Sequence, residues 1–115
     1  MYRRSYSEEV TGSGMESRAR EREAFEQVIE LLQIASKDGS GSKACINALF
    51  FLRGLWLILL EDIASPENAL PQDLRRRLGS IGLWMLNRAE DIRQGRSHDI
   101  EGLIEINAII RDGLK

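Results

Sequence analysis

The residues of this chain that could carry out chemistry do not have the spacing that catalysis requires. The only histidine, His98, lies between Ser97 and Asp99. A nucleophile must stand beside an oriented base, and sequence neighbours cannot form such a triad among themselves. The acidic pairs 61–62 and 90–91 are also sequence neighbours, which point about 100° apart on a helix. We therefore expect no catalytic residues and no enzyme activity, with His98 as a solvent-exposed residue at a helix start.

Metal and cofactor sites are equally unexpected. A structural zinc site uses about four Cys or His ligands, and this chain has only Cys45 and His98. The stretch 39–43, Gly-Ser-Gly-Ser-Lys, superficially resembles a phosphate loop, but it lacks the spacing and has no preceding strand. Because a lone cysteine forms no internal disulfide, the chain fits a reducing compartment. We expect no metal and no cofactor.

A cluster of arginines offers a possible contact with phosphates. Residues 70–97 contain six arginines and three acids, a local charge of +3. Successive helical positions fan around the axis, however, and no set of base-stacking aromatics is interleaved with them. A solvated face is the simpler interpretation. The residues that would carry RNA binding are Arg75, Arg76, Arg77, Arg88 and Arg93.

Apolar and aromatic residues around a single charge favour binding of another macromolecule. Arg53 interrupts the most apolar run of the chain, and a buried unpaired charge costs several kcal/mol. Its side chain must therefore reach water or an acid. Aromatic residues and Arg dominate binding hot spots, although the two tryptophans are more simply explained as core. The candidate partner-binding residues are Phe50, Phe51, Arg53, Trp56, Leu57, Ile58 and Trp84.

The elements that position these residues are all predicted to be helices. Apolar residues recur every three or four positions over 15–37, 42–64, 71–93 and 97–114, and no segment has strand alternation bounded by hairpin turns. Ser42 and Ser97 are the expected N-caps of the second and fourth helices, and Pro71 is expected in the first position of the third. Short links favour antiparallel neighbours. The sequence predicts an all-α fold, a single small domain of about four helices in a mostly antiparallel bundle.

The N-terminal segment 1–14 is expected to be a flexible arm, followed by a helical domain over 15–115. Thr11-Gly12-Ser13-Gly14 is a cluster of helix breakers, and the residues before it lack apolar periodicity. Tyr2 and Tyr6 could pack back onto the domain. No apolar stretch follows the first arginines, so an ordinary secretory signal peptide is not expected.

The helix over 42–64 is apolar nearly all round. Such a helix must be covered on several sides, so it is the central element or one of its faces is a docking surface. Its apolar run over 48–60 is shorter than the roughly 20 residues of a membrane span, and acids follow it directly. We expect no membrane insertion. The 115 residues have 43% hydrophobic residues, 30% charged residues and a formal net charge of −2, which suits one soluble domain and supplies no global positive field for nucleic acid.

The order of several segments resembles the FlaF family, flagellar biosynthesis regulators of alphaproteobacteria. The most specific segment is Ser-Pro-Glu-Asn-Ala-Leu-Pro at residues 65–71, and the linker 39–42 matches least well. The similarity covers essentially the whole chain. The other segments that carry it are the opening Met1-Tyr2 with Tyr6, and residues 48–56, 80–84 and 103–114.

The resemblance implies a cytoplasmic helical protein needed for flagellin production and export. It implies flagellin as the partner, through the amphipathic terminal helices by which flagellin subunits polymerise, and the translational regulator FlbT as an additional partner. It implies no catalytic residues. Two alternatives remain open: a post-transcriptional regulator that binds flagellin mRNA through the arginines named above, and a homo-oligomeric helical adaptor whose apolar excess forms a homodimer interface.

Overall fold

The structure, a computed structural model, describes the backbone of residues 10–113 and the side chains of residues 19–113. The described chain forms four α-helices and no strand, which confirms the predicted all-α class. The helices are α1 (Val10–Asp38), α2 (Lys43–Ala64), α3 (Gln72–Arg93) and α4 (Ile100–Asp112).

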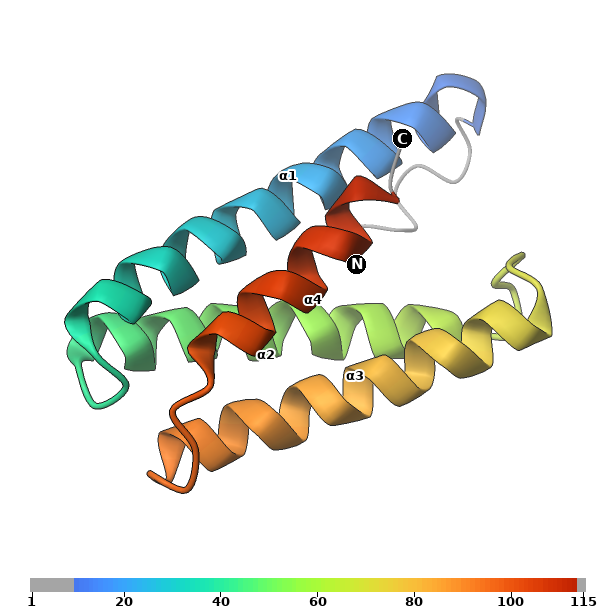
Figure 1. Cartoon of the computed structure of the whole chain (residues 1–115). Coiled ribbons are helices and arrows are strands. Elements are labelled where there is room, and N and C mark those ends of the chain that lie inside the picture. The colour runs from blue at the N-terminus through green and yellow to red at the C-terminus, as the bar shows by residue number, and fades with distance from the viewer. Residues whose placement is uncertain (1–9, 114–115) are drawn as a thin grey trace.

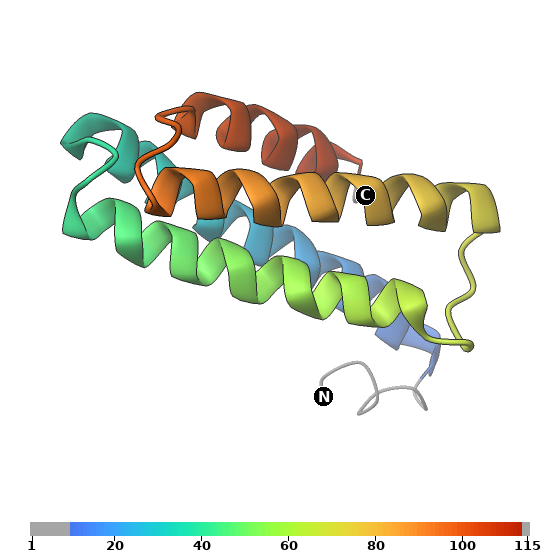
Figure 2. The same cartoon turned by 90° about the horizontal axis from the view of Figure 1, so that it is seen from below.

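The helices pack in chain order around one core. α1 packs against α2, α2 against α3, and α4 returns to pack mainly on α1 (Figure 1). α2 and α3 lie side by side along most of their length (Figure 2). α4 makes little contact with α3, although the two are consecutive. At 13 residues against 22 for α3, α4 is also too short to cover its neighbours fully.

Helix α1 begins earlier than the sequence predicts. It starts at Val10, so residues 11–14, expected to break the chain, are helical. A glycine weakens a helix by about 1 kcal/mol relative to Ala but does not forbid it. The two glycines in this segment therefore do not prevent α1 from beginning at Val10. The rest of the expected arm, residues 1–9 with Tyr2 and Tyr6, lies outside the described residues. At its other end α1 stops as predicted, with Gly39 at φ 105° and its N–H donating to Ala35 O.

The later helix starts differ slightly from expectation. Ser42 caps α2 as predicted, with its Oγ accepting from the Cys45 N–H at 3.1 Å. The cap of α4 is Asp99, which accepts from the Gly102 N–H at 2.9 Å, and not Ser97. Ser97 instead accepts from the Asp99 N–H and shapes the turn before the cap. Pro71 occupies the N-cap position of α3 and so lies one residue before the expected place.

The core contains a buried polar connection between α2, α3 and α4. The Trp56 Nε1–H donates to Asn107 Oδ1 at 2.9 Å, and the Asn107 amide donates to Leu103 O and to Met85 Sδ. Asn107 is fully buried, as is Met85. The edge of the Trp56 ring also meets Phe25 of α1, with ring centroids 5.9 Å apart. One indole thus ties α2 to α1 and α4. The buried apolar residues are Phe25, Val28, Ile29, Leu32, Ala35, Cys45, Ala48, Leu49, Leu52, Trp56, Met85, Ala89, Ile92, Ile100 and Leu103.

Gly82 permits the close approach of α3 to α2. A Cβ at this position would lie 2.6 Å from Leu60 Cδ2, well inside van der Waals contact. Overpacking a close helix contact costs about 1–3 kcal/mol, and the better helix propensity of alanine returns about 1 kcal/mol of that cost. Gly82→Ala should therefore lower the free energy of unfolding by about 1 kcal/mol. Urea denaturation followed by circular dichroism measures this change. Leu60→Ala in the same background should recover part of it, and an unchanged or raised stability of Gly82→Ala would contradict the close approach.

Candidate functional site

An open apolar groove runs between α1 and α2. We call it the α1–α2 groove; its volume is about 840 Å³. Its lining is apolar except for an amide and two charged side chains, one on each helix. The lining residues are Ala24, Gln27, Val28, Glu30, Leu31 and Ile34 of α1, and Phe50, Phe51, Arg53, Gly54, Leu55, Leu57 and Ile58 of α2.

The phenylalanines of α2 are the most prominent part of the groove. Phe50 is 71% exposed and Phe51 is 50% exposed, and their rings meet edge to face with centroids 5.3 Å apart. Leu57 and Ile58 continue the apolar surface one to two turns further along and are also exposed. The cause lies in the sequence of α2, which is apolar nearly all round. The face through Cys45, Leu52 and Trp56 is buried in the bundle, and nothing among the described residues covers the opposite one.

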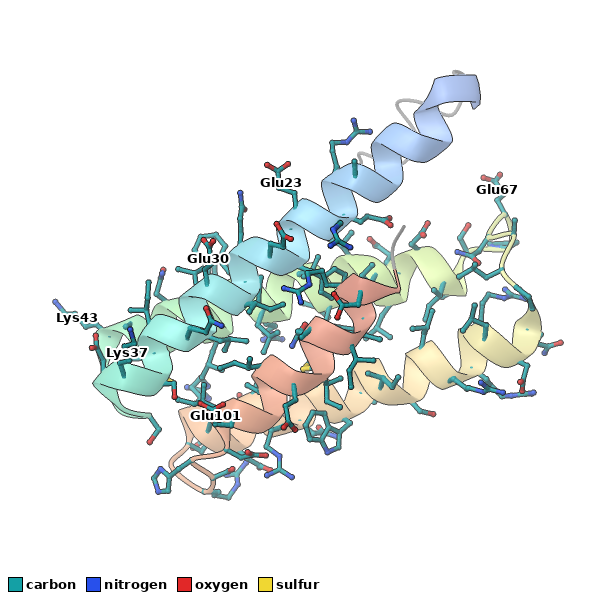
Figure 3. The ribbon with its side chains drawn as sticks, turned by 45° about the horizontal axis from the view of Figure 1, so that its top comes forward. Glu23, Glu30, Lys37, Lys43, Glu67 and Glu101 are labelled. Atoms are coloured by element: carbon teal, nitrogen blue, oxygen red, sulfur yellow. The ribbon has the colours of Figure 1, made fainter. Side chains whose placement is uncertain are left out.

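The position of Arg53 in the apolar run requires its side chain to reach either water or an acid. In the structure it reaches water. Its side chain is exposed and makes no ion pair with the described part of the chain. It lines the α1–α2 groove from the α2 side, whereas Glu30 lines it from the C-terminal half of α1 (Figure 3). The two opposite charges therefore stand on opposite walls of an apolar groove.

A smaller second groove lies between α2 and α3, with a volume of about 460 Å³. It shares Phe50 and Arg53 with the first groove, so these two side chains form a ridge between the grooves. Its polar wall is Glu90 of α3, which pairs with Arg93 at 2.6 Å. Hydrogen bonds from Arg93 and Gln94 lower the pKa of Glu90 to about 2, so this carboxylate remains charged at neutral pH. The second groove is thus more polar than the first and already has a neutralised ion pair.

The two tryptophans differ in exposure. Trp56 is 1% exposed and hydrogen-bonded to Asn107, so in this conformation it belongs to the core and no partner can touch it. The prediction that Trp56 contacts a partner is therefore wrong, because Trp56 lies on the face of α2 that is turned to the core. Trp84 is 37% exposed on α3, with the Arg88 guanidinium 5.3 Å from its ring centre. It lines neither groove.

Sequence reasoning missed the α1 side of the groove. Ile34 is 52% exposed, and Leu31 lies beside it on the groove wall. These residues are three apart and fall off the main apolar stripe of α1. That second short stripe was the signal that could have identified them. Five of the seven predicted contact residues lie together in the groove, all of them on α2. The other two are the tryptophans.

The arginines proposed for phosphate contacts are mostly engaged within the protein. Arg76 and Arg77 both pair with Asp73, at 3.3 and 2.8 Å. Arg88 hydrogen-bonds Ser97 and lies 3.7 Å from Asp99, and Arg93 pairs with Glu90, as noted above. These partners occupy guanidinium groups that a phosphate would otherwise contact.

The remaining chemical groups have structural roles. Cys45 is buried, and burial raises the pKa of its thiol, so it packs as a small neutral side chain. His98 Nδ1 lies 2.6 Å from Ser40 Oγ and joins the α1–α2 loop to the segment before α4. No group of three or more potential metal ligands occurs among the described residues. α2 alone in that part of the chain is long and apolar enough to cross a membrane by length and composition, a test that core helices of soluble proteins also pass.

Fold and groove together define an antiparallel helical protein with an apolar face of α2 that no described residue covers. The chain belongs to the FlaF family: the family model "Flagellar protein FlaF" matches residues 2–114. This protein is therefore related to the flagellum, as the sequence resemblance implies. No curated protein and no solved structure matches the chain.

Proposed function

We propose that this protein binds flagellin in the cytoplasm as a secretion chaperone and couples flagellin synthesis to export. The observation that carries the proposal is the α1–α2 groove, with Phe50 and Phe51 at its rim. Monomers with one apolar patch of this kind usually use it to bind another molecule. Membership of the FlaF family supplies the flagellar context, and flagellin is the partner that we propose within it.

The dimensions of the groove suit a helix. On α1 it extends from Ala24 to Ile34, which is about 15 Å at 1.5 Å per residue, or about three helical turns. An amphipathic helix recognised in a groove presents anchors at positions i, i+3 or i+4, and i+7. The terminal helices of flagellin are amphipathic because they polymerise in the filament. A monomer held before export needs that face covered, and the groove would cover three turns of it.

Regulation would follow from occupancy. When flagellin accumulates, more of this protein is occupied, and a translational regulator such as FlbT that distinguishes the two states could respond. The mechanism requires binding alone, without catalysis, metal or cofactor. The shared ridge of Phe50 and Arg53 is where a bound helix would alter the surface offered to a second partner.

Isothermal titration of purified monomeric flagellin into the full-length protein tests the proposal. We expect a complex with low-micromolar or tighter affinity, a negative heat-capacity change from apolar burial and weak dependence on salt. Absence of association with both proteins folded would refute it. A parallel titration with flagellin mRNA distinguishes the RNA-binding alternative, since phosphate contacts make affinity fall steeply with salt.

The homodimer alternative has its own measurement. Sedimentation velocity over a range of concentrations should give a monomer in the absence of flagellin. Leu57 lines the α1–α2 groove and not the second groove. A stable dimer that dissociates when Leu57 is replaced by Asp would show that a second copy covers the α1–α2 groove, and would count against flagellin as its occupant.

A further inference from the structure

We propose that the α1–α2 groove accepts a single amphipathic helix in one direction, with Gly54 as the point of close backbone approach and Glu30 and Arg53 as the residues that select the direction. This inference rests on the proposed function and specifies the partner segment: about three turns of helix with acids on one flank and bases on the other.

Gly54 is the first observation. It lies in the interior of α2, where glycine weakens a helix relative to alanine, yet a Cβ there would meet nothing within 4 Å. Gly82 has an internal reason to be glycine, since a Cβ would collide with Leu60. Internal packing gives Gly54 no such reason. Because Gly54 lines the groove, the missing side chain leaves α2 backbone open to a partner.

The two charges are the second observation. Among the described residues that line the groove, Glu30 and Arg53 are the charged ones, and they stand on opposite helices. Neither makes an ion pair with the described part of the chain. The α1 wall therefore offers a negative charge and the α2 wall a positive one, and both remain available to an occupant.

Helix geometry converts these charges into a direction. A helix lying with its apolar stripe on the groove floor turns one flank to α1 and the other to α2. Reversing the helix exchanges the flanks. An occupant with acids on one flank and bases on the other therefore satisfies Glu30 and Arg53 in one direction and meets like charges in the other, which costs affinity.

The Gly54→Ala variant tests the close approach. Its melting temperature should rise by about 4 °C, because alanine favours the helix and nothing obstructs the new methyl group. Its affinity for flagellin, and for a synthetic amphipathic helix of three turns, should fall about tenfold because the contact becomes overpacked. Gly79→Ala is the matched control: a Cβ there is 4.0 Å from Ile63 Cδ1, outside the groove, so stability should change without loss of affinity. Unchanged binding by Gly54→Ala would overturn this part of the inference.

Two synthetic peptides test the direction. They share one apolar stripe and have their acidic and basic flanks exchanged, and each carries a spin label at its N-terminus. The label should broaden amide signals at the Ile34 end of the groove for one peptide and at the Ala24 end for the other. The double variant Glu30→Arg with Arg53→Glu should exchange the two patterns. Broadening at the same end for both peptides, broadening at both ends, or no binding of either peptide would overturn the selection of direction.

These outcomes separate the two proposals. Directional peptide binding without any flagellin complex refutes flagellin as partner and leaves the groove inference in place. A tight flagellin complex that is indifferent to Gly54→Ala, together with peptides that bind without direction, supports the proposed function and refutes the inference.

Discussion

Replacement of Asn107 by alanine should lower the free energy of unfolding by about 3 kcal/mol, the largest effect on stability that we expect from a polar residue here. Asn107 is fully buried and accepts the Trp56 Nε1–H at 2.9 Å. Its removal leaves that donor without a partner in the core, which costs about 1–3 kcal/mol. It also leaves a small cavity against Met85. Chemical denaturation followed by circular dichroism measures the loss.

A double-mutant cycle identifies the cause. Trp56→Phe removes the donor and should be destabilising by itself, since it orphans Asn107 Oδ1 and removes part of the indole. The double variant should lose less stability than the two single losses added together, with a coupling of about 1 kcal/mol or more, as residues in one hydrogen-bond network do. Strict additivity would mean that the Trp56–Asn107 hydrogen bond contributes nothing to folding.

The Phe50→Asp variant should lose about 100-fold in affinity for flagellin while it folds normally. Phe50 is 71% exposed and lines both grooves. A charge there must be desolvated against the apolar face of the incoming helix, and loss of an aromatic anchor at a hot spot costs about 2–4 kcal/mol of binding. Stability should change by no more than about 0.5 kcal/mol, since the ring is not part of the core. Titration calorimetry and thermal melting measure the two quantities separately.

Leu83→Asp provides the matched control. Leu83 is similarly exposed, at 61%, but lies on α3 and lines neither groove. The same apolar-to-charged change should leave flagellin affinity within about twofold of the wild type. Equal losses for Phe50→Asp and Leu83→Asp would mean that binding depends on general surface hydrophobicity, and not on the α1–α2 groove.

The helices and the groove residues of α2 were predictable from the sequence to different degrees. Helical periodicity located all four helices, and Ser42 was correctly predicted as the N-cap of α2. The helix ends were less certain, because a helix tolerates weak positions such as residues 11–14 and because neighbouring polar residues compete for a cap. Asp99 prevailed over Ser97 at the start of α4 because its carboxylate lies where it can accept from the Gly102 N–H.

The two tryptophans illustrate what local pattern cannot decide. Both lie in helices among apolar residues, and both have the residue type of a binding hot spot. Burial depends on which face of each helix meets a neighbour, and that follows from how α4 and α1 close over α2. Trp56 meets Asn107, a residue 51 positions away in the sequence, whereas Trp84 stays half exposed beside Arg88.

The amino-acid sequence by itself determined that α2 has more apolar surface than one bundle face can cover, because hydrophobicity all round a helix is a local property of its residues. It determined the helical class and the family for the same reason, since periodicity and residue order are local. Only the tertiary structure decided which part of that surface remains open. The α1 wall of Ile34 and Glu30, opposite Arg53 and Gly54, exists because two antiparallel helices meet at one particular rotation about their axes, and that rotation is set by packing between residues far apart in the chain.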